Sequence, residues 1–413
     1  MDEQIEQIIP ERKKITLSDI SILKNEGFPL KIFDEKVISF FNAISKTIMK
    51  DRKINQIPSL VALGYWLRKG NIETIIKEND FLISHKKYKA TPIGIVFHIC
   101  PSNVDTMFLY SLAISLLAGN KNILRISSKI NNTEINALFD IITNVMNNPE
   151  FEIFKHYICI VNYEHIDSIN MEFSLRANAR IIWGGDATVE LFKSFKTHSK
   201  TKDIVFPDRI SYAVFKAKEF ETIDEKMKGE IVKKFFNDSY TFDQRGCSSA
   251  QIVFIYGESA DIKIFEKEFY SRLKDYADKF YTTDIYSLSS LKYNHLVSDV
   301  IENKGSVNDI LHEDNLLYFT EISEPEMNLV SCGGGYFYIK NIQNIESISS
   351  FISPKVQTIS YFGLNKEEIE RLFEVSAGKG IDRIVPIGEA LSFDYIWDGY
   401  NILAELCSIK TVK

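Results

Sequence analysis

Hydrophobic positions change their spacing near residue 93. Before that point the sequence is mostly charged, with apolar residues at helical spacing in segments 40–49 and 60–67, which predicts helices packed through one face. After it come short continuous apolar runs of strand length, separated by turns and by longer segments of helical length. This alternation predicts parallel βαβ units and an α/β fold.

The predicted elements fall into two halves. In the first half, strands are predicted at 94–99, 122–127, 156–161 and 180–184, with helices at 104–117, 132–146 and 187–195. In the second half, a helix is predicted at 224–236 and strands at 251–256, 334–340 and 356–362. The first half is typical of a doubly wound nucleotide-binding domain and the second of another α/β domain. We place the boundary near residue 237 and expect the active site in the cleft between the domains.

Composition narrows the class of protein. The 413 residues carry a formal net charge of −7 and the sequence pI is about 5.7, which argues against nucleic acid as a partner. The first residues contain no apolar core of a signal peptide. The longest apolar stretch, 107–118, is far shorter than the roughly 20 residues that a membrane span needs. The sequence therefore predicts a cytoplasmic protein without a membrane span.

The cysteines and histidines are scattered. Five cysteines include no CxxC pair, and seven histidines include no HExxH motif, so neither a disulfide framework nor a metal site is predicted.

Cys247 suits a nucleophile because it lies in a Gly-Cys-Ser-Ser turn, which can expose the sulfur. On the residues alone Cys100, at the end of a predicted strand, and Cys332, before three glycines, remain alternatives. Cys159 and Cys407 are expected to be structural, the usual fate of free cysteine.

Four segments, taken in order, resemble the signature segments of the aldehyde dehydrogenase superfamily. They are the strand, PSN turn and helix of 93–117, GNKNILRISSK at 119–129, WGGD at 183–186 and GCSS at 246–249. FHICPSN, FDQRGCSS and RIVPIGEALSFDYIWDGY narrow the resemblance to the acyl-CoA reductase (LuxC-type) family, over residues 90–405. The usual GxGxxG and P-loop motifs are missing. The resemblance therefore implies the fold: a Rossmann-type cofactor domain plus an α/β catalytic domain.

The resemblance also implies the domain spans and the catalytic residues. The cofactor domain with its N-terminal helical segment would cover 1–237 and the catalytic thiol domain 238–380. The segment 381–413 would pack on the cofactor domain or at an oligomer interface. Cys247 would be the nucleophile. Asn103, whose other interpretation is a helix N-cap, would donate to the oxyanion of the tetrahedral adduct.

The implied cofactor is NADPH. Arg125 falls at the position that contacts the adenosine ribose, and Ser128 stands where a glutamate would repel a 2′-phosphate. Ser127 and Lys129 complete this turn, although Arg125 and Lys129 could also be solvated charges at the end of a strand. Gly184 and Gly185 of WGGD would approach the cofactor phosphates at a helix N-terminus.

One departure from the superfamily's sequence pattern sets the expected direction of the reaction. The glutamate that activates water for hydrolysis of the acyl-enzyme is missing from segment 206–214, and the nearest carboxylate, Asp208, is followed by Arg209 and could pair with it. The resemblance thus implies reduction of an acyl-CoA, or another acyl thioester, to an aldehyde. A partner acyl-synthetase and a homo-oligomer are expected. The alternatives are an oxidising aldehyde dehydrogenase, a non-catalytic acyl-binding subunit and a cofactor-free acyl transferase.

Overall fold

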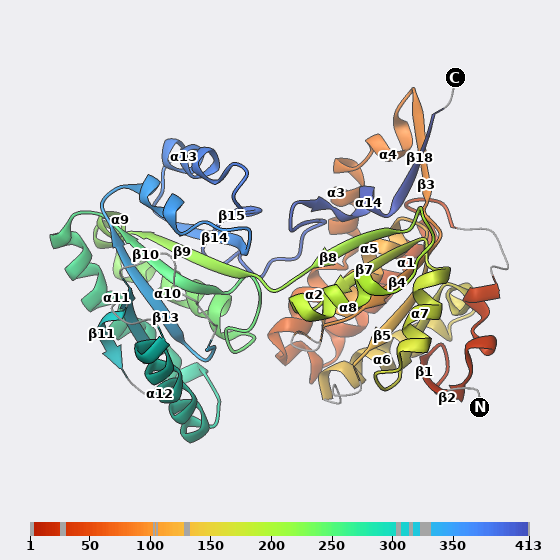
Figure 1. The fold of residues 1–413 in the computed structure, drawn as a ribbon, viewed down its shortest axis with the longest axis horizontal. Coiled ribbons are helices and arrows are strands. Elements are labelled where there is room, and N and C mark those ends of the chain that lie inside the picture. Colours follow the sequence, from red (N-terminus) through yellow and green to blue (C-terminus); the bar gives the residue numbers. More distant parts are fainter. Residues whose placement is uncertain are drawn as a thin grey trace. The chain divides into compact units, whose positions relative to one another are not determined.

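The chain folds as two compact units. The computed structural model describes residues 4–24, 30–101, 104, 106–127, 133–302, 307–313, 317–322 and 332–411 (Figure 1). The first unit combines residues 1–208 with 393–413, and the second is the continuous segment 209–392. The described residues of each unit form a seven-stranded sheet. The α/β class predicted from the sequence is confirmed.

The first unit opens with strands and helices that precede its parallel sheet. They are β1 (Ile5–Ile9), β2 (Lys13–Ile15), α1 (Glu35–Lys50), α2 (Pro58–Trp66), α3 (Lys69–Glu78), α4 (Phe81–Ser84) and β3 (Tyr88–Pro92). The βαβ part follows as β4 (Ile95–Ile99), α5 (Met107–Leu117), β5 (Lys121–Ile126), α6 (Thr133–Met146), β6 (Ile158–Asn162), α7 (Asp167–Arg176), β7 (Ala179–Trp183), α8 (Asp186–Ser194) and β8 (Lys202–Phe206).

The strand order of this first sheet is β2-β1-β6-β5-β4-β7-β8. The last five are mutually parallel, and β1 runs antiparallel to β6. Every residue of β4, β5 and β7 is buried, because a parallel sheet is covered on both faces. The short strands β1 and β2, of which β2 forms the edge of the sheet, lie in a region expected to be helical. Their few alternating residues give a weak signal beside the helical stripes.

The C-terminal residues return to the first unit. They form β16 (Ile396–Trp397), β17 (Tyr400–Asn401), α14 (Ile402–Glu405) and β18 (Cys407–Thr411). Strand β18 pairs with β3 in an antiparallel ribbon (Figure 1). The side-chain amide of Asn120 donates to the carbonyl of Leu406 at 3.0 Å. These contacts attach the end of the described chain to the unit in which it began.

The second unit contains the elements between these two parts. They are β9 (Ile210–Lys216), α9 (Ala217–Thr222), α10 (Glu225–Tyr240), β10 (Ala250–Tyr256), α11 (Ser259–Phe280), α12 (Ile285–Glu302), β11 (Val307–Glu313), β12 (Tyr318–Ile322), β13 (Tyr336–Ile342), β14 (Val356–Phe362), α13 (Lys366–Ser376) and β15 (Arg383–Pro386). The strand order is β11-β12-β13-β10-β9-β14-β15, and only β11 is antiparallel to its neighbour among these described strands.

Successive residues of β9 pack into two different cores. Ala213 and Phe215 join the core formed with α9, α10 and α11, whereas Tyr212 and Val214 join the core on the opposite face, with Leu372 of α13. This alternation follows from the two-residue period of a strand. A strand buried on both faces is therefore continuously apolar in sequence.

The division between the units differs from the expected boundary near residue 237. That residue lies inside α10, and the division follows Asp208. The boundary lies before β9 because β9 pairs with β10 and β14 in the centre of the second sheet, so it belongs to the second unit.

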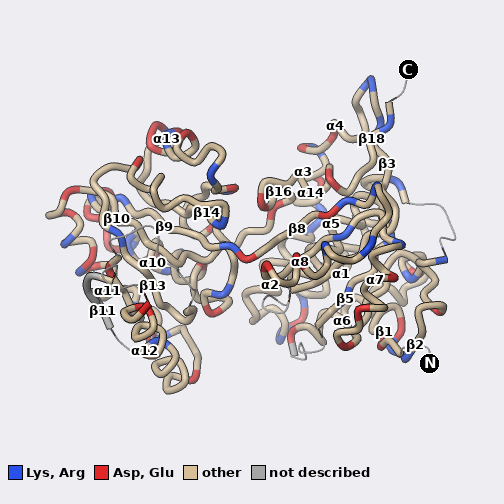
Figure 2. Tube along the Cα trace, viewed as in Figure 1, with Lys and Arg blue, Asp and Glu red and all other residues tan. Residues whose placement is uncertain are grey.

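Charged residues are interspersed along the chain in both units, without a long basic run (Figure 2). Among the described residues, no helix combines the length and apolar character needed to cross a membrane.

Candidate active site

Cys247 lies at the amino edge of the second sheet, the edge at which the parallel strands begin. The loop that carries it, residues 241–249, leads from the C-terminus of α10 into the first residue of β10. The first residues of β9, β13 and β14 lie at the same edge, since these strands are parallel to β10. We call residues 241–249 the cysteine loop.

Two β-bulges flank Ser211 at this edge. On one side, Val356 pairs with Ile210 and Ile359 with Tyr212, so Gln357 and Thr358 together oppose Ser211. On the other side, Gln251 of β10 is an extra residue beside Ser211. Bulges bend a strand and redirect its side chains, and they are frequent beside active sites. The register of the sheet thus breaks where Cys247 approaches it.

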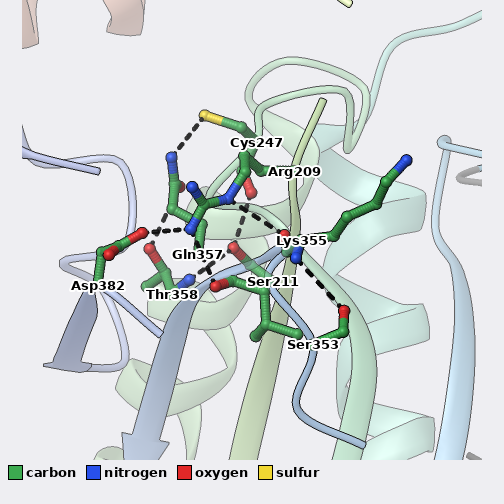
Figure 3. Close-up of polar contacts among 9 residues, drawn as sticks. Arg209, Ser211, Cys247, Ser353, Lys355, Gln357, Thr358 and Asp382 are labelled. Atoms are coloured by element: carbon green, nitrogen blue, oxygen red, sulfur yellow. Dashed lines mark hydrogen bonds and ion pairs between the residues drawn. The ribbon is translucent and has the colours of Figure 1, made fainter. Parts of the chain in front are cut away.

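The hydroxyl of Ser211 bridges the cysteine loop to β14 (Figure 3). It donates to the backbone carbonyl of Cys247 at 2.7 Å and accepts from the backbone N–H of Thr358 at 3.1 Å. The side chain thereby replaces ladder hydrogen bonds that the bulge interrupts. Ser211 holds the cysteine and the bulge at a fixed separation.

The cysteine loop contains two consecutive residues in the left-handed region, Asp243 at φ 52° and Gln244 at φ 60°. Such a conformation costs roughly 1–2 kcal/mol for a residue with a side chain. The fully buried amide of Gln244 compensates with four hydrogen bonds. Its Nε2 donates to the carbonyls of Ala250 and Tyr336 at 2.8 Å each, and its Oε1 accepts from the N–H groups of Gly335 and Tyr336 at 3.0 Å each.

The glycines at 333–335 allow this loop to approach β13. Gly334 donates its N–H to the carbonyl of Asp243 at 2.8 Å. A Cβ on Gly333 would lie 2.7 Å from the same carbonyl oxygen. Since Gly333 also has φ 81°, a side chain there would be both strained and in collision. The fold thus uses the three glycines for close packing of two backbones.

The sulfur of Cys247 is half-buried and accepts a hydrogen bond (Figure 3). The donor is the side-chain Nε2 of Gln357, 3.3 Å from Sγ. The Oε1 of Gln357 accepts from the hydroxyl of Thr358 at 3.3 Å, which orients the amide so that its nitrogen faces the sulfur. A donor to sulfur favours the thiolate, the nucleophilic form of cysteine.

The two alternative cysteines have less suitable surroundings. Cys100 is buried in the first unit, and this burial raises the pKa of its thiol far above the usual value, although Arg125 opposes the shift. Cys332 is half-buried, and desolvation raises its pKa to about 11. Both residues are therefore protonated near neutral pH. Cys159 and Cys407 are buried, and burial raises each pKa to about 12, which fits structural roles.

The candidate cofactor-binding residues within the described ranges lie at the carboxyl edge of the first sheet, the edge at which its parallel strands end. Arg125 is near the end of β5, with its guanidinium carbon 5.0 Å from the centre of the Tyr163 ring and Nη2 3.4 Å from Nδ1 of His165. Its buried Nε has no hydrogen-bond partner among the described residues. A buried cation with an unused donor fits an anionic ligand such as a nucleotide phosphate. Ser127 follows β5 and is half-buried.

Gly184 and Gly185 connect β7 to α8, with Gly185 as the N-cap of the helix. The helix N-terminus can accept a phosphate. A Cβ on Gly185 would lie 2.8 Å from Oδ2 of Asp208, so this carboxylate already lies against the N-terminus of α8. Arg209 forms its ion pair with Asp382, in place of the pairing with Asp208 expected from the sequence. Gly185 fits a close approach, but the adjacent carboxylate of Asp208 disfavours a phosphate at that point.

Three of the predicted residues, Asn103, Ser128 and Lys129, lie outside the described residues. Within the described ranges, no three His, Cys, Asp or Glu side chains are grouped as ligands for a metal ion.

Sequence reasoning missed four residues that the structure brings to these sites: Ser211, Gln244, Gln357 and His165. A glutamine three residues before a candidate cysteine nucleophile gives no local signal for a contact with β13. Gln357 is separated from Cys247 by 110 positions, so only the pairing of β14 with β9 reveals their contact. His165 follows β6, and the parallel order β6-β5 predicts that it lies near Arg125 once the strand order is known.

Comparisons with known proteins identify the fold and a family. The chain matches the family model "Acyl-CoA reductase (LuxC)" over residues 44–409. A search of curated proteins found no match. Several solved structures are similar in fold. A glyceraldehyde-3-phosphate dehydrogenase, GapN, from Methanocaldococcus jannaschii, complexed with NADP, has 15% identity and a TM-score of 0.63, covering 100% of this chain and 98% of that chain.

Two further solved structures are similar to this chain in fold. An aldehyde dehydrogenase of Mycobacterium tuberculosis complexed with NAD+ has 11% identity and a TM-score of 0.62, with 95% of this chain and 88% of that chain covered. A lactaldehyde dehydrogenase has 12% identity and a TM-score of 0.61, with coverages of 91% and 86%. At such low identities the similarity shows the fold alone, and that fold is the one of aldehyde dehydrogenases.

Proposed function

The chain belongs to the acyl-CoA reductase (LuxC) family, and from this premise we propose that it reduces an acyl-CoA, preferably a fatty one, to an aldehyde with NADPH. The family and the fold support an oxidoreductase of aldehyde chemistry. The observation that carries the finer proposal is the state of Cys247. Its sulfur is half-buried, held by a loop with two bridging side chains, and hydrogen-bonded by Gln357.

In the proposed first step the Cys247 thiolate attacks the carbonyl carbon of the thioester. A C–S bond to Cys247 forms while the bond to the carrier sulfur breaks, and the departing thiolate takes the electron pair and a proton from solvent. Asn103, proposed as oxyanion donor, would stabilise the tetrahedral adduct by about 3 kcal/mol. The product of this step is an acyl group on Cys247.

In the second step the acyl group is reduced. NADPH would supply the hydride that converts the acyl carbonyl into the aldehyde oxidation level. Arg125, Ser127, Ser128 and Lys129 would hold the adenosine end, and Gly184 with Gly185 would allow a close approach of the phosphates. Cys247 then leaves as a thiolate when the reduced adduct collapses, which frees the aldehyde and restores the nucleophile.

The test of this function uses the full chain with a panel of acyl-CoAs of different chain length and NADPH. Consumption of NADPH at 340 nm should match aldehyde formation, measured with a hydrazine reagent, because each turnover uses one hydride. A carrier-protein thioester, with and without an acyl-synthetase partner, tests for another donor. Aldehyde formation without cofactor consumption, or no aldehyde from any thioester, contradicts the proposal.

Cofactor choice is tested separately. Ser128→Glu should weaken NADPH binding by roughly 1.5–3 kcal/mol, the range for a charged hydrogen bond lost or opposed, and should leave NADH binding much less affected. Fluorescence titration of both cofactors measures this difference. Equal NADPH affinity in Ser128→Glu and the parent would remove Ser128 from the 2′-phosphate site.

The direction of the reaction distinguishes this function from an oxidising aldehyde dehydrogenase. Hydrolysis of the acyl-enzyme requires a base within reach of a water molecule, and segment 206–214 contains no glutamate. With aldehyde and NADP+, turnover should therefore be slow until a thiol acceptor such as CoA is added. Rapid formation of free acid without thiol would favour the oxidative enzyme.

A further inference from the structure

We propose that Gln357 is a catalytic residue that stabilises the Cys247 thiolate by a side-chain N–H hydrogen bond. This inference rests on the proposed function for its catalytic meaning, but its geometry is independent of any substrate. Gln357 touches the reacting sulfur itself, at 3.3 Å from Nε2 to Sγ. Its role is therefore direct, whereas Ser211 and Gln244 only position the loop.

The location of Cys247 explains why a side-chain donor is needed. The cysteine loop leaves the C-terminus of α10, where a helix presents carbonyl groups and the negative end of its dipole. The hydroxyls of Thr241 and Ser249 donate to two of these carbonyls, those of Asn237 and Asp238. A thiolate near such an end gains nothing from helix N–H groups. The neighbouring strand β14 supplies a donor through Gln357.

The β14 bulge supplies that donor at a fixed place. Gln357 is fully buried, and its backbone carbonyl accepts from the N–H of Asp382 at 2.7 Å. On the preceding residue, the carbonyl of Val356 accepts from the N–H of Ile381 and from Arg209. On the following residue, Thr358 is tied to Ser211. Both neighbours of Gln357 are thus held, so its amide is preorganised toward the sulfur.

The side-chain amide is oriented as well as placed. The Thr358 hydroxyl donates to Oε1 of Gln357 at 3.3 Å, and Nε2 of the same amide donates to the sulfur at 3.3 Å. The nitrogen, a pure donor, therefore faces Cys247 (Figure 3). An N–H donor is worth more to a charged sulfur than to a thiol, because hydrogen bonds to ions are the stronger ones. The contact therefore lowers the cost of ionising the nucleophile.

The experiment measures the reactivity of Cys247 without substrate or cofactor. The full chain is treated with iodoacetamide across a series of pH values, and alkylation of the Cys247 peptide is followed by mass spectrometry. Gln357→Met, similar in size but unable to donate, should shift the midpoint of the rate profile upward by about one pH unit, a tenfold change in the thiolate equilibrium. Gln357→Glu, nearly isosteric, should shift it further, because an ionised carboxylate repels the thiolate.

The matched control is Gln7→Met. Gln7 is also buried and also donates one side-chain hydrogen bond, to the carbonyl of Glu11, but it lies in β1 of the first unit. Its replacement should leave the Cys247 profile unchanged. An unchanged profile in folded Gln357→Met, or in Gln357→Glu if the first variant does not fold, overturns the inference. A shift in both Gln357→Met and Gln7→Met also overturns it, since the cause is then general destabilisation.

Failure of the proposed function has a different signature. If the parent protein makes no aldehyde from any acyl thioester while Gln357→Met still shifts alkylation, the hydrogen bond to the thiolate stands and the reaction is wrong. If the parent is active, Gln357→Met at neutral pH should slow acylation of Cys247 about tenfold and regain much of the rate at higher pH. A loss of rate that is constant with pH contradicts a role through the thiolate.

Discussion

The two sheets carry their candidate functional residues at opposite edges. In the first sheet, Arg125 lies near the carboxyl end of β5 and Gly184 follows the carboxyl end of β7, where the N-terminus of α8 begins. In the second sheet, Cys247 precedes the amino end of β10, where a helix C-terminus arrives. The first edge presents the backbone N–H groups of a helix N-terminus, although the carboxylate of Asp208 lies against that of α8. The second edge presents the carbonyls of a helix C-terminus, and there the side chain of Gln357 donates to the sulfur.

This difference explains why polar side chains gather at one edge. Ser211 and Gln244 bond backbone groups at the amino edge, and Gln357 donates to the sulfur of Cys247. Their replacement should therefore be costly, while cysteines at the other edge should be dispensable for chemistry. Three predictions test the contrast, beginning with the largest effect.

Cys247→Ala should abolish formation of a covalent acyl-enzyme, because the nucleophile is removed. Cys100→Ala, at the carboxyl edge of the first sheet, and Cys332→Ala should keep it, since burial raises both of their pKa values. Labelled acyl-CoA followed by intact mass reports the adduct. A persistent adduct in Cys247→Ala, with its loss in one of the other variants, would assign the nucleophile to that residue.

Gln244→Leu should lower the free energy of unfolding of the second unit by roughly 3 kcal/mol. The change leaves buried backbone groups of Ala250, Gly335 and Tyr336 without the partners that Gln244 provides, at about 1–3 kcal/mol for each group left unsatisfied. Hydrogen exchange of peptides from β10 and β13 measures the effect locally. The control is Gln56→Leu at an exposed position; equal protection in the two variants would show that the loop is held by other contacts.

His98 makes the first unit sensitive to acid. Burial in β4 lowers its pKa to about 4, and its ring nitrogens contact Ser111 and Asn122 at 2.8 and 3.0 Å. The unfolded value is about 6.5, so the folded state binds fewer protons and stability is full above that value. It is then lost as pH falls through 6.5 toward 4, by about 2 kcal/mol between pH 8 and pH 5.

Tryptophan fluorescence isolates this effect, because Trp66, Trp183 and Trp397 all belong to the first unit. Denaturant unfolding at the two pH values gives the difference in stability. His98→Asn should unfold with a much weaker dependence on pH, whereas the exposed control His156→Asn should keep the dependence of the parent. An equal slope in His98→Asn and the parent would place the acid sensitivity elsewhere.

The sequence predicted most of the central strands but little of the site. Buried parallel strands such as β4 and β10 are nearly continuous apolar runs, so their positions follow from the pattern of the sequence alone. Cys247 is a candidate through its turn and the family resemblance. Gln357 and Ser211 could not be found this way, since their meaning depends on a bulge, and bulges depend on register between distant strands. Strand β1 was missed because its five residues, IEQII, are too short a run to show a clear period.

The ribbon of β3 and β18 has a consequence for biosynthesis. Strand β3 emerges from the ribosome long before β18, and the entire second unit is made between them. Domains fold as units during synthesis, so segment 209–392 can complete its sheet while β3 still lacks its partner. The last stage of folding is then a contact between residues more than three hundred positions apart, such as Thr91 with Ser408. Loop closure of that length is slow unless the intervening chain is already compact, so early folding of the inserted unit shortens the path by which the first unit is finished.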